Sequence, residues 1–479
     1  MSTAEPSPRS AAVALVLVPW VVLAVAAVIV WVLAPTGHYE LLVAGAPFVA
    51  AAVYSPRLTA VVGVASILLY TALRIWPPHE AAGGDIWWIK LALVVAASGS
   101  AVLISQARLR ERTLHRSLDI AAVLQRELLP AQTTGTTTVD VCHRYMPTDT
   151  EAGVGGDWFD VIPLSSGRVA LAMGDVIGHG IEAASLMGRM RIAVQTLGEL
   201  DLAPEELLAH MDVTASLHAT EDDIRTLAAT CLYLIYDPVT RRCTIASAGH
   251  PPPALRHPGG TVEFLHLPEH PPLGMGDTVF ESTTLTLAED TVIAVYTDGL
   301  LDLRHHHLED ALTPLAAALS RDIDPLDRLC QYVCDHALRD PSDDAALLLA
   351  RVTGLPEDRV GTWALRSTPE EIALARKAVT QQLDTWNLSE MAFATELIVT
   401  ELATNALIHA SPPITLRLIK DASLICEISD ASHTAPHQRH ARALDEDGRG
   451  LAMVSQLASR WGTRYTDTGK TIWAEQPLP

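Results

Sequence analysis

The pattern of hydrophobic residues divides the chain into a strongly apolar N-terminal part and a mixed remainder. Residues 11–34 form an uninterrupted apolar run without a charge, and three further apolar segments follow at about 41–55, 58–75 and 87–107. Because roughly 20 apolar residues span a bilayer, these segments predict an α-helical membrane bundle of about four transmembrane helices. The second and third segments are near the lower limit of about 17 residues, so a short re-entrant hairpin is the alternative for them.

Basic residues predict the orientation of this membrane domain, residues 1–107. Arg9 precedes the first span, Arg57 lies between the second and third, and four arginines follow the fourth: Arg108, Arg110, Arg112 and Arg116. Positively charged loops stay on the cytoplasmic side. We therefore expect a multi-pass protein of the plasma membrane with both termini, and everything that follows the spans, in the cytoplasm.

Residues 108–132 are predicted to form a linker helix with a regulatory role. Five residues, four of them apolar or small, recur along it at spacings of four and three: Leu114, Leu118, Ala121, Gln125 and Leu128. This spacing is typical of a helix that packs against another helix. Pairing with a second copy, which gives the homodimer that we expect, and packing on the next domain both fit the pattern.

The soluble part divides at residues 352–366, where an apolar run gives way to Gly, Pro and charged residues. We expect a first domain over 133–354, with strands at 168–175, 231–237, 243–249, 291–299 and 345–352. A second domain is expected over 362–479, with helices at 370–386 and 390–409 and strands near 414–420 and 423–429.

Composition restricts the function further. The 479 residues carry a net charge of −22, and residues 1–106 contain four basic and four acidic side chains, so the whole net charge lies in the soluble part. An acidic soluble part disfavours nucleic acid binding. The six cysteines form no CxxC pair, and we expect them to be reduced core thiols.

Acidic residues end strands or occupy tight turns at four places in the first soluble domain: Asp157, Asp175, Asp298 and the pair Asp343–Asp344. Four such turns that converged would repel one another as bare charges, but they would bind divalent cations well. Ligation by oxygen alone suits Mg²⁺ or Mn²⁺. Two such ions can share a water molecule, lower its pKa and direct it at a phosphorus atom. The pattern therefore predicts a two-metal site.

The motifs around these residues occur in the order GGDWFDVIPL, GRVALAMGDVIGHGIEAASLMGRMR, ATCLYLIYDPVT, ASAGHPPPAL, YTDGLLD and DDAALLL. Over about 220 residues the chain resembles the bacterial SpoIIE-type branch of the metal-dependent type-2C (PPM) Ser/Thr protein phosphatases. The resemblance implies an αββα sandwich, in which two sheets pack together between outer helices and the metal ions lie at one edge.

The resemblance also implies a ligand set. Asp175 is implied to bridge both ions, and the other implied ligands are Asp157, the carbonyl group of Val176, Asp298 and Asp343. The family's DDMT motif reads DDAA here, so Asp344 is the alternative to Asp343. His179 and His250 lie in Gly-rich turns, where we expect a structural role ahead of a contact with phosphate.

The second soluble domain carries another series of motifs. The helical segment ATELIVTELATNALIHA places Glu401 and Asn405 four residues apart on one face, and CEISDAS, EDGRGLAMVSQLA and GKTIWAE follow. Over about 110 residues this domain resembles the GHKL ATPase fold, in particular the anti-sigma-factor serine-kinase branch. The resemblance implies an α/β sandwich that binds ATP with Mg²⁺.

By this resemblance, Asn405 holds Mg²⁺ against the phosphates and Glu401 is the candidate base for an acceptor hydroxyl. Asp430 is implied to accept a hydrogen bond from the adenine amino group, and further nucleotide contacts are implied at Gly448, Gly450, Gly469 and Thr471. The family's D-x-G-x-G turn reads DASHT here. Both phosphotransfer and ATP binding without turnover therefore stay open.

Together these resemblances imply a membrane-bound phosphatase of a partner-switching pathway. Its substrate would be a phosphorylated anti-sigma-factor antagonist, a STAS-domain protein, and a sigma factor or anti-sigma factor is a further candidate partner. The fused domain would restore the phosphate or bind partner proteins. We hypothesise that a signal through the spans biases one activity; removal of residues 1–107 without effect on either rate would contradict this.

Two alternatives belong to other functional classes. In a membrane scaffold or sensor, the ATP-binding domain or both domains bind partners without turnover, and the full set of aspartates disfavours this for the first domain only. A sensor histidine kinase also joins spans to a GHKL domain, but it needs a phosphorylated His just before that domain. His115 lies far upstream of Glu401, which disfavours this alternative.

Overall fold

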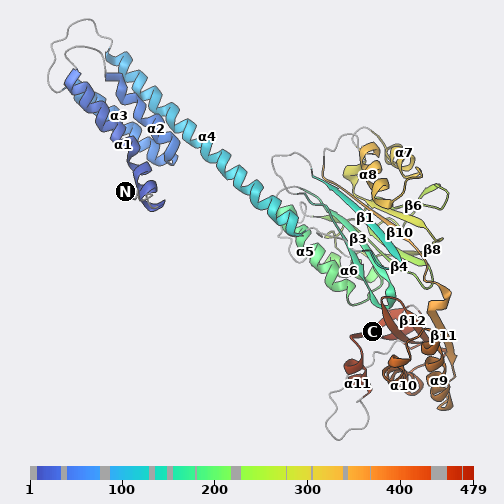
Figure 1. Cartoon of the computed structure of the whole chain (residues 1–479). Coiled ribbons are helices and arrows are strands. Elements are labelled where there is room, and N and C mark those ends of the chain that lie inside the picture. The colour runs from blue at the N-terminus through green and yellow to red at the C-terminus, as the bar shows by residue number, and fades with distance from the viewer. Residues whose placement is uncertain are drawn as a thin grey trace. The chain divides into compact units, whose positions relative to one another are not determined.

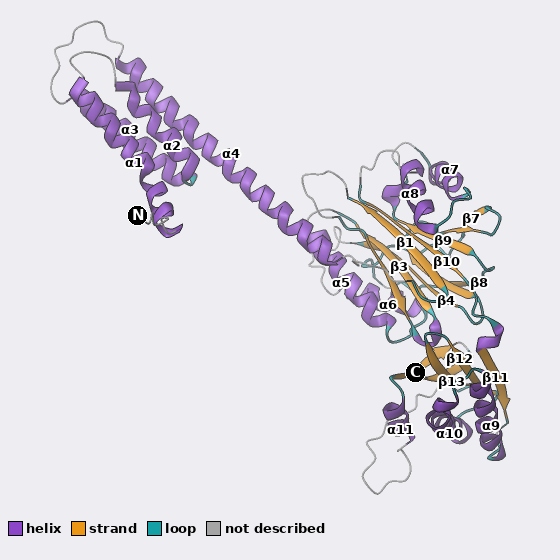
Figure 2. Cartoon of the chain, viewed as in Figure 1, coloured by secondary structure: helices purple, strands orange, loops and turns teal. Residues whose placement is uncertain are grey.

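The computed structural model of the chain describes residues 8–33, 40–75, 87–128, 135–147, 155–178, 181–216, 228–276, 278–301, 303, 306–337, 343–366, 368–432, 450–466 and 468–479. It separates into two compact units, Met1–Ile120 and Ala121–Pro479 (Figure 1). The first unit consists of helices, and the second contains all three β-sheets (Figure 2).

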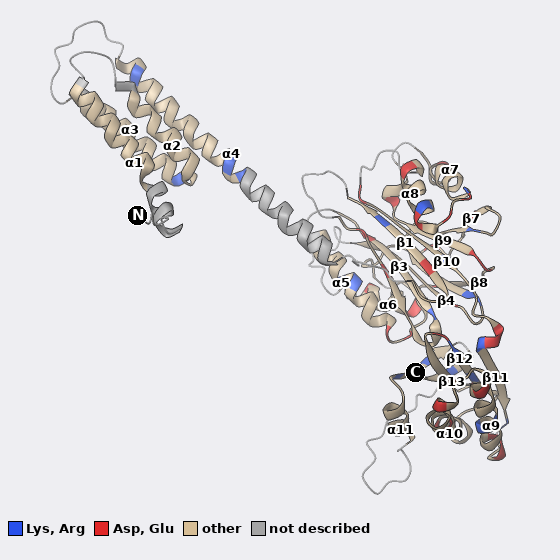
Figure 3. Ribbon diagram, viewed as in Figure 1, with Lys and Arg blue, Asp and Glu red and all other residues tan. Residues whose placement is uncertain are grey.

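The first unit contains the helices α1 (Pro8–Leu33), α2 (Gly45–Val53), α3 (Pro56–Ile75) and the start of α4 (Trp87–Leu128). The first three pack on one another through small and apolar side chains, among them Leu23, Ala26, Ala46, Ala50 and Val62. Many large apolar side chains point outward, including Val21, Trp31, Leu68, Leu93 and Leu103. Few charges occur on α2, on α3 and on residues 87–107 of α4 (Figure 3), as expected for a surface that faces lipid.

Three helical segments in the described part of the chain are long and apolar enough to cross a membrane: Pro56–Leu73, Trp87–Arg110 and Ser389–His409. The last belongs to the second unit, where Ile398 and Leu402 pack in a soluble core. The segments Leu17–Val32 and Leu42–Val53 are shorter apolar helices. The second predicted span is therefore shorter than a regular membrane helix, and the number of spans stays a prediction.

The predicted linker helix is confirmed as a helix. It is the C-terminal part of α4, which runs without a break over 42 residues and is about 63 Å long at roughly 1.5 Å per residue. The pairing positions predicted within it lie outside the side chains that the structure describes.

The first soluble domain contains two five-stranded antiparallel sheets. One has the order β1 (Val139–Met146), β10 (Ala345–Val352), β9 (Thr291–Tyr296), β6 (Ala254–Arg256) and β7 (Val262–Phe264). The other has the order β2 (Trp158–Pro163), β3 (Val169–Val176), β4 (Ala229–Asp237), β5 (Arg242–Ala248) and β8 (Ser282–Thr286). The five strands predicted from the sequence are all present.

Strand β3 shows why these residues form a sandwich. Its alternate side chains Val169, Leu171 and Met173 pack between the two sheets, and Ala170 and Ala172 pack beneath helices on the other face. A strand that is buried on both faces appears in the sequence as a continuous run of apolar residues.

Helices cover the outer face of each sheet. Helices α5 (Ile181–Gly198) and α6 (Pro204–Ser216) contact β2–β5, whereas α7 (Leu308–Leu319) and α8 (Leu326–Ala337) contact the sheet of β1 and β10. The predicted αββα sandwich is thus confirmed.

The C-terminal domain is a two-layer α/β sandwich. Its sheet has the order β11 (Val360–Leu365), β12 (Ile414–Lys420), β13 (Ser423–Asp430), β15 (Gly469–Pro477) and β14 (Arg460–Thr466). Helices α9 (Glu370–Thr385), α10 (Ala392–His409) and α11 (Gly450–Leu457) contact it. The predicted helices and strands are confirmed to within two residues, and β11 begins two residues before the predicted start of this domain. All six cysteines are free and buried, as expected.

Candidate metal centre and nucleotide site

The predicted metal ligands come from the ends of strands in both sheets of the sandwich. Asp157 immediately precedes β2 and Asp175 lies near the end of β3, and these strands form one hairpin in which Trp158 pairs with Gly174. Asp298 follows β9 and Asp343 precedes β10, and these two strands are neighbours in the other sheet.

Thr297 joins the two groups, although sequence reasoning did not single it out. Its buried hydroxyl donates a hydrogen bond of 2.7 Å to Asp157 Oδ2 and accepts one of 2.8 Å from the Ala346 backbone N–H. One side chain therefore ties Asp157, from the first sheet, to the β9–β10 edge of the second. The position of this Thr directly before Asp298 in the YTDG motif is the sequence feature that could have indicated its role.

Two glycines allow the strand ends to approach one another. A Cβ atom at Gly156 would collide with the Val176 carbonyl oxygen and lie 3.0 Å from Asp175 Oδ1. A Cβ atom at Gly299 would collide with the carbonyl oxygen of Asp344. Larger residues at these positions would force the carboxylate-bearing segments apart.

Burial and neighbouring carboxylates raise the pKa of three of these aspartates, Asp157, Asp175 and Asp298. Burial, followed by the charge of Asp175, raises the pKa of Asp157 well above its usual range. Burial and the charge of Asp298 raise the pKa of Asp175 to about 7, and burial and the charge of Asp343 raise the pKa of Asp298. Like charges held together out of water behave in this way.

Asp343 and Asp344 approach this cluster differently. Asp343 is exposed, its Oδ1 accepts a hydrogen bond of 2.9 Å from the Asp344 N–H, and its charge acts on Asp175 and Asp298. Asp344 is only 9% exposed, and its carboxylate lies beside Gly155. Both residues adjoin the cluster, so the choice of Asp343 as the ligand stays a prediction.

The donor chemistry of the cluster fits a hard divalent cation, because the converging side chains offer only carboxylate oxygens. In the described part of the chain, no three His, Cys, Asp or Glu side chains are already grouped closely enough to hold a metal ion. The individual ligands therefore stay predictions. His179 lies outside the described residues. His250 is buried, with Nδ1 2.9 Å from the Thr230 hydroxyl.

The second site lies at one end of the C-terminal sheet. Glu401 and Asn405 are half-buried and one helical turn apart on α10. The Glu401 carboxylate reaches the start of α11, because a Cβ atom at Gly450 would collide with its Oε2. Gly448 lies outside the described residues.

Asp430, the last residue of β13, has one unused acceptor. Its Oδ1 accepts hydrogen bonds from the Ser432 N–H (2.8 Å), the Ser432 hydroxyl (2.6 Å) and Lys470 Nζ (3.1 Å). Its Oδ2 is buried and has no hydrogen-bond partner among the described residues. A buried orphan acceptor is uncommon, and it fits an N–H donor such as the amino group of adenine.

The neighbouring residues shape the same end of the sheet. The Thr471 hydroxyl lies 2.8 Å from the Ser429 hydroxyl. Gly469 has a φ of +150°, and a Cβ atom there would collide with the Asp430 carbonyl oxygen. Lys470, which forms an ion pair with Asp430, was missed by sequence reasoning, although the GKT segment contains it.

The chain matches two protein families over separate regions. Residues 165–353 match Stage II sporulation protein E (SpoIIE), and residues 365–475 match the histidine kinase-like ATPase domain. Asp175, Asp298 and Asp343 lie within the first match, and Asp157 precedes it.

Two curated relatives are phosphoserine phosphatases of Bacillus subtilis (strain 168). RsbP is 31% identical over 149 residues, which are 31% of this chain and 36% of RsbP. RsbU is 25% identical over 143 residues, which are 30% of this chain and 40% of RsbU. The chain thus spans less than half the length of these relatives.

Similar solved structures include the RsbU and RsbW domains of Rv1364c from Mycobacterium tuberculosis, with 23% identity and a TM-score of 0.44. That match covers 74% of this chain and 96% of the other. The SiaA-PP2C domain of Pseudomonas aeruginosa has 20% identity and a TM-score of 0.40, and the match covers 50% of this chain and 98% of the other.

Metal binding is expected to weaken as the pH falls through neutrality. Without a cation Asp175 has a pKa of about 7, so at lower pH a proton occupies the carboxylate that must be ionised to bind the metal. We expect the Kd for Mn²⁺, measured on the full chain by calorimetry, to fall by about tenfold between about pH 6 and pH 8. A Kd that is constant over this range would contradict the assignment of Asp175.

Loss of the Asp430 carboxylate is expected to weaken nucleotide binding. Asp430→Asn removes a charged acceptor and the ion pair with Lys470, so we expect a fluorescent ATP analogue to bind about 10–100-fold more weakly. Asp384→Asn, at an exposed position on α9, is the matched control and should stay within about twofold of the parent chain. Equal affinities for both variants would exclude Asp430 from the site.

Proposed function

We propose that this chain, which combines a SpoIIE-type phosphatase domain with a histidine kinase-like ATPase domain, is a membrane-anchored protein serine/threonine phosphatase. The observation that carries the proposal is the group of aspartates at strand ends of two sheets that the Thr297 hydroxyl ties together; burial and neighbouring carboxylates raise the pKa of Asp157, Asp175 and Asp298. Such a group is stabilised by divalent cations, and two Mn²⁺ or Mg²⁺ ions fit its oxygen-only donors.

We propose Asp157, Asp175, Asp298 and Asp343, with the Val176 carbonyl group, as the metal-holding set, and Asp344 as the alternative to Asp343. Ions bound there would supply a Lewis-acid centre and a water molecule of lowered pKa. Thr297 fixes Asp157 by its hydrogen bond of 2.7 Å. Gly156 lies against both the Val176 carbonyl oxygen and Asp175 Oδ1, where a Cβ atom would collide with the carbonyl oxygen.

The proposed substrate is a phosphoserine or phosphothreonine of an anti-sigma-factor antagonist of the STAS class. The names of the relatives RsbP and RsbU, both phosphoserine phosphatases, support the phosphoserine part. The fused ATPase domain supports the proposal that the substrate belongs to a partner-switching pathway, because a kinase of that pathway would oppose the phosphatase. A sigma or anti-sigma factor is a further proposed partner, and a homodimer is the proposed assembly.

For the C-terminal domain we propose ATP with Mg²⁺ as the ligand. Asp430 would accept from adenine, Asn405 would hold Mg²⁺ and Glu401 would act as the base for phosphotransfer. The remaining proposed contacts are Gly448, Gly450, Gly469 and Thr471. The orphan Oδ2 atom of Asp430 supports nucleotide binding, whereas kinase activity rests on the position of Glu401 beside the start of α11.

The proposed domain boundaries are 1–107 for the membrane part, 108–132 for the linker helix, and 133–354 and 362–479 for the two soluble domains. Apolar helices with outward-facing apolar side chains support anchoring. We propose several spans in the plasma membrane, with both enzymatic domains in the cytoplasm as the basic residues indicate. Protease protection of these domains in sealed cytoplasmic-side-in vesicles tests the orientation.

Phosphatase activity of the full chain should require both metal and Asp175. With Mn²⁺ we expect turnover of p-nitrophenyl phosphate and of a phosphoserine STAS protein, and Asp175→Asn should lower it by at least about 100-fold because a shared ligand is lost. Asp335→Asn, at an exposed position on α8, is the matched control and should keep the parent rate.

Turnover that persists in a metal chelator, or in Asp175→Asn at the parent rate, would contradict a two-metal phosphatase. If no phosphoester is turned over although ATP binds, the alternative of a membrane scaffold that only binds partners would replace the proposal.

A further inference from the structure

Glu427 occupies an unusual position on the C-terminal sheet. Alternate residues of β13 face the helix-covered core, namely Leu424, Cys426 and Ile428, so Glu427 belongs to the opposite face. A two-layer sandwich leaves that face to water, where a glutamate is ordinary. Glu427 is nevertheless 0% exposed, because another part of the same compact unit covers it.

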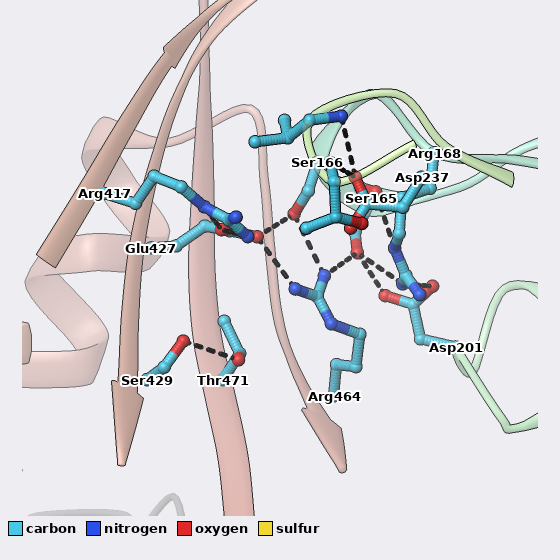
Figure 4. A network of polar contacts seen from close by, with 12 residues as sticks. Ser165, Ser166, Arg168, Asp201, Asp237, Arg417, Glu427, Ser429, Arg464 and Thr471 are labelled. Carbon is cyan, nitrogen blue, oxygen red and sulfur yellow. Dashed lines mark hydrogen bonds and ion pairs between the residues drawn. The ribbon is translucent and has the colours of Figure 1, made fainter. Parts of the chain in front are cut away.

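The cover is the turn of the β2–β3 hairpin in the phosphatase domain, residues Ser165–Gly167 (Figure 4). The Ser166 hydroxyl donates a hydrogen bond to Glu427 Oε1. Arg464, from β14, lies between the domains: its Nη2 is 3.0 Å from Glu427 Oε1, and its Nη1 is 3.2 Å from Ser165 Oγ and 3.1 Å from Ser166 Oγ.

Each side of this contact is anchored in its own domain. Arg417 of β12 holds Glu427 through Nε at 2.6 Å. In the phosphatase domain, the Ser165 hydroxyl donates to Asp201, and Arg168 Nη2 lies 2.6 Å from Asp201 Oδ1. The result is a continuous polar network of side chains that are almost entirely buried, except that 20% of the Arg417 side chain is exposed.

The network favours one docked arrangement of the two domains. Burial would raise the pKa of Glu427, but Arg464 and Arg417 outweigh it and lower the pKa to about 2. The carboxylate is therefore charged at any physiological pH. Removal of one member leaves a buried charge without its partner, which is strongly unfavourable.

An apolar group supports the same docking. Val239 of the phosphatase domain and Leu355, in the segment that joins the two domains, pack against Ile419 and Ile425 on the open face of the C-terminal sheet. Beside the polar network lies a cavity of about 490 Å³, with Asp201 on one wall and Arg460 and Trp473 on another. The two domains are thus held together tightly at Glu427, and the cavity beside it leaves space for a small shift of one domain against the other.

The contact lies between the two sites along defined elements. The turn at Ser165–Gly167 is one end of the β2–β3 hairpin, and Asp157 and Asp175 are at its other end. Glu427 is three residues before Asp430 on β13. A displacement of β13 or of the hairpin therefore has a direct route from one site to the other through packed, hydrogen-bonded strands.

We propose that the contact centred on Glu427 couples nucleotide binding in the C-terminal domain to the state of the metal centre. Nucleotide occupancy alters how the β2–β3 hairpin is held, and by thermodynamic linkage the metal centre alters nucleotide affinity by the same factor. This inference rests on the proposed function in taking Asp430 as part of a nucleotide site and the aspartates at the end of the β2–β3 hairpin as a metal centre.

Hydrogen exchange of the full chain in lipid nanodiscs tests the coupling without any need for turnover. With a saturating non-hydrolysable ATP analogue, we expect backbone amides of residues 158–176 to change their exchange rates by at least about fivefold. Glu427→Gln should reduce this response to less than about twofold. Binding of a fluorescent ATP analogue confirms saturation in each sample.

Two further variants provide a second test of the interface and a matched control. Ser166→Gly removes the hydroxyl that crosses the interface, leaves the Glu427 ion pairs intact and suits the φ of +65° at this position. It should also reduce the response, and it replaces Glu427→Gln in the test if that variant does not fold. Glu396→Gln breaks the exposed ion pair with Arg376 in the same domain and should respond like the parent chain.

The coupling is overturned if the parent chain binds the nucleotide without any change in residues 158–176, if it binds no nucleotide, or if the folded interface variants respond as fully as the parent. Phosphatase turnover in the same samples separates this from the proposed function. Turnover without an exchange response overturns the coupling alone, and an exchange response without turnover overturns the phosphatase alone.

Discussion

Carboxylates that share a small, poorly hydrated space repel one another, and the sandwich domain holds several of them together at one edge. The β2–β3 hairpin brings Asp157 next to Asp175, the β9–β10 pair supplies Asp298 and Asp343, and the Thr297 hydroxyl ties the two groups together. Like charges in such a place lower stability unless a cation joins them. Gly156 and Gly299 allow the close approach of the strand ends that carry these carboxylates.

The protein contains two kinds of buried carboxylate, represented by Glu427 and by the aspartates of the sandwich domain. Two arginines lower the pKa of Glu427 to about 2, so its charge is balanced within the protein and it has a structural role. None of the groups that act most strongly on Asp157, Asp175 or Asp298 is Lys or Arg, and their pKa values rise. The proposed metal ions would balance the charge of these aspartates, whereas the charge of Glu427 is balanced as long as the two domains stay docked.

Much of this architecture could be predicted from the sequence. Apolar runs that end in turn residues located strands such as β10 and β12, and motifs located Asp175 and Asp430. The docking of Ser166 on Glu427 could not be predicted, because the partners are 261 residues apart and an isolated Glu in a strand reads as solvent-exposed. The predicted apolar segment at 41–55 is helical over Glu40–Val53, but hydropathy does not show whether so short a segment crosses a membrane, so its role as a span stays a prediction.

The number of Mn²⁺ ions bound per full chain, measured by electron paramagnetic resonance during a titration, tests the two-metal assignment most directly. We expect two ions per chain. Their spectrum should show magnetic coupling between neighbouring ions, because one carboxylate is proposed to bridge both. Asp175→Asn should abolish the coupled signal. No tightly bound Mn²⁺, or two magnetically isolated ions, would contradict a shared site at the edge of the sheets.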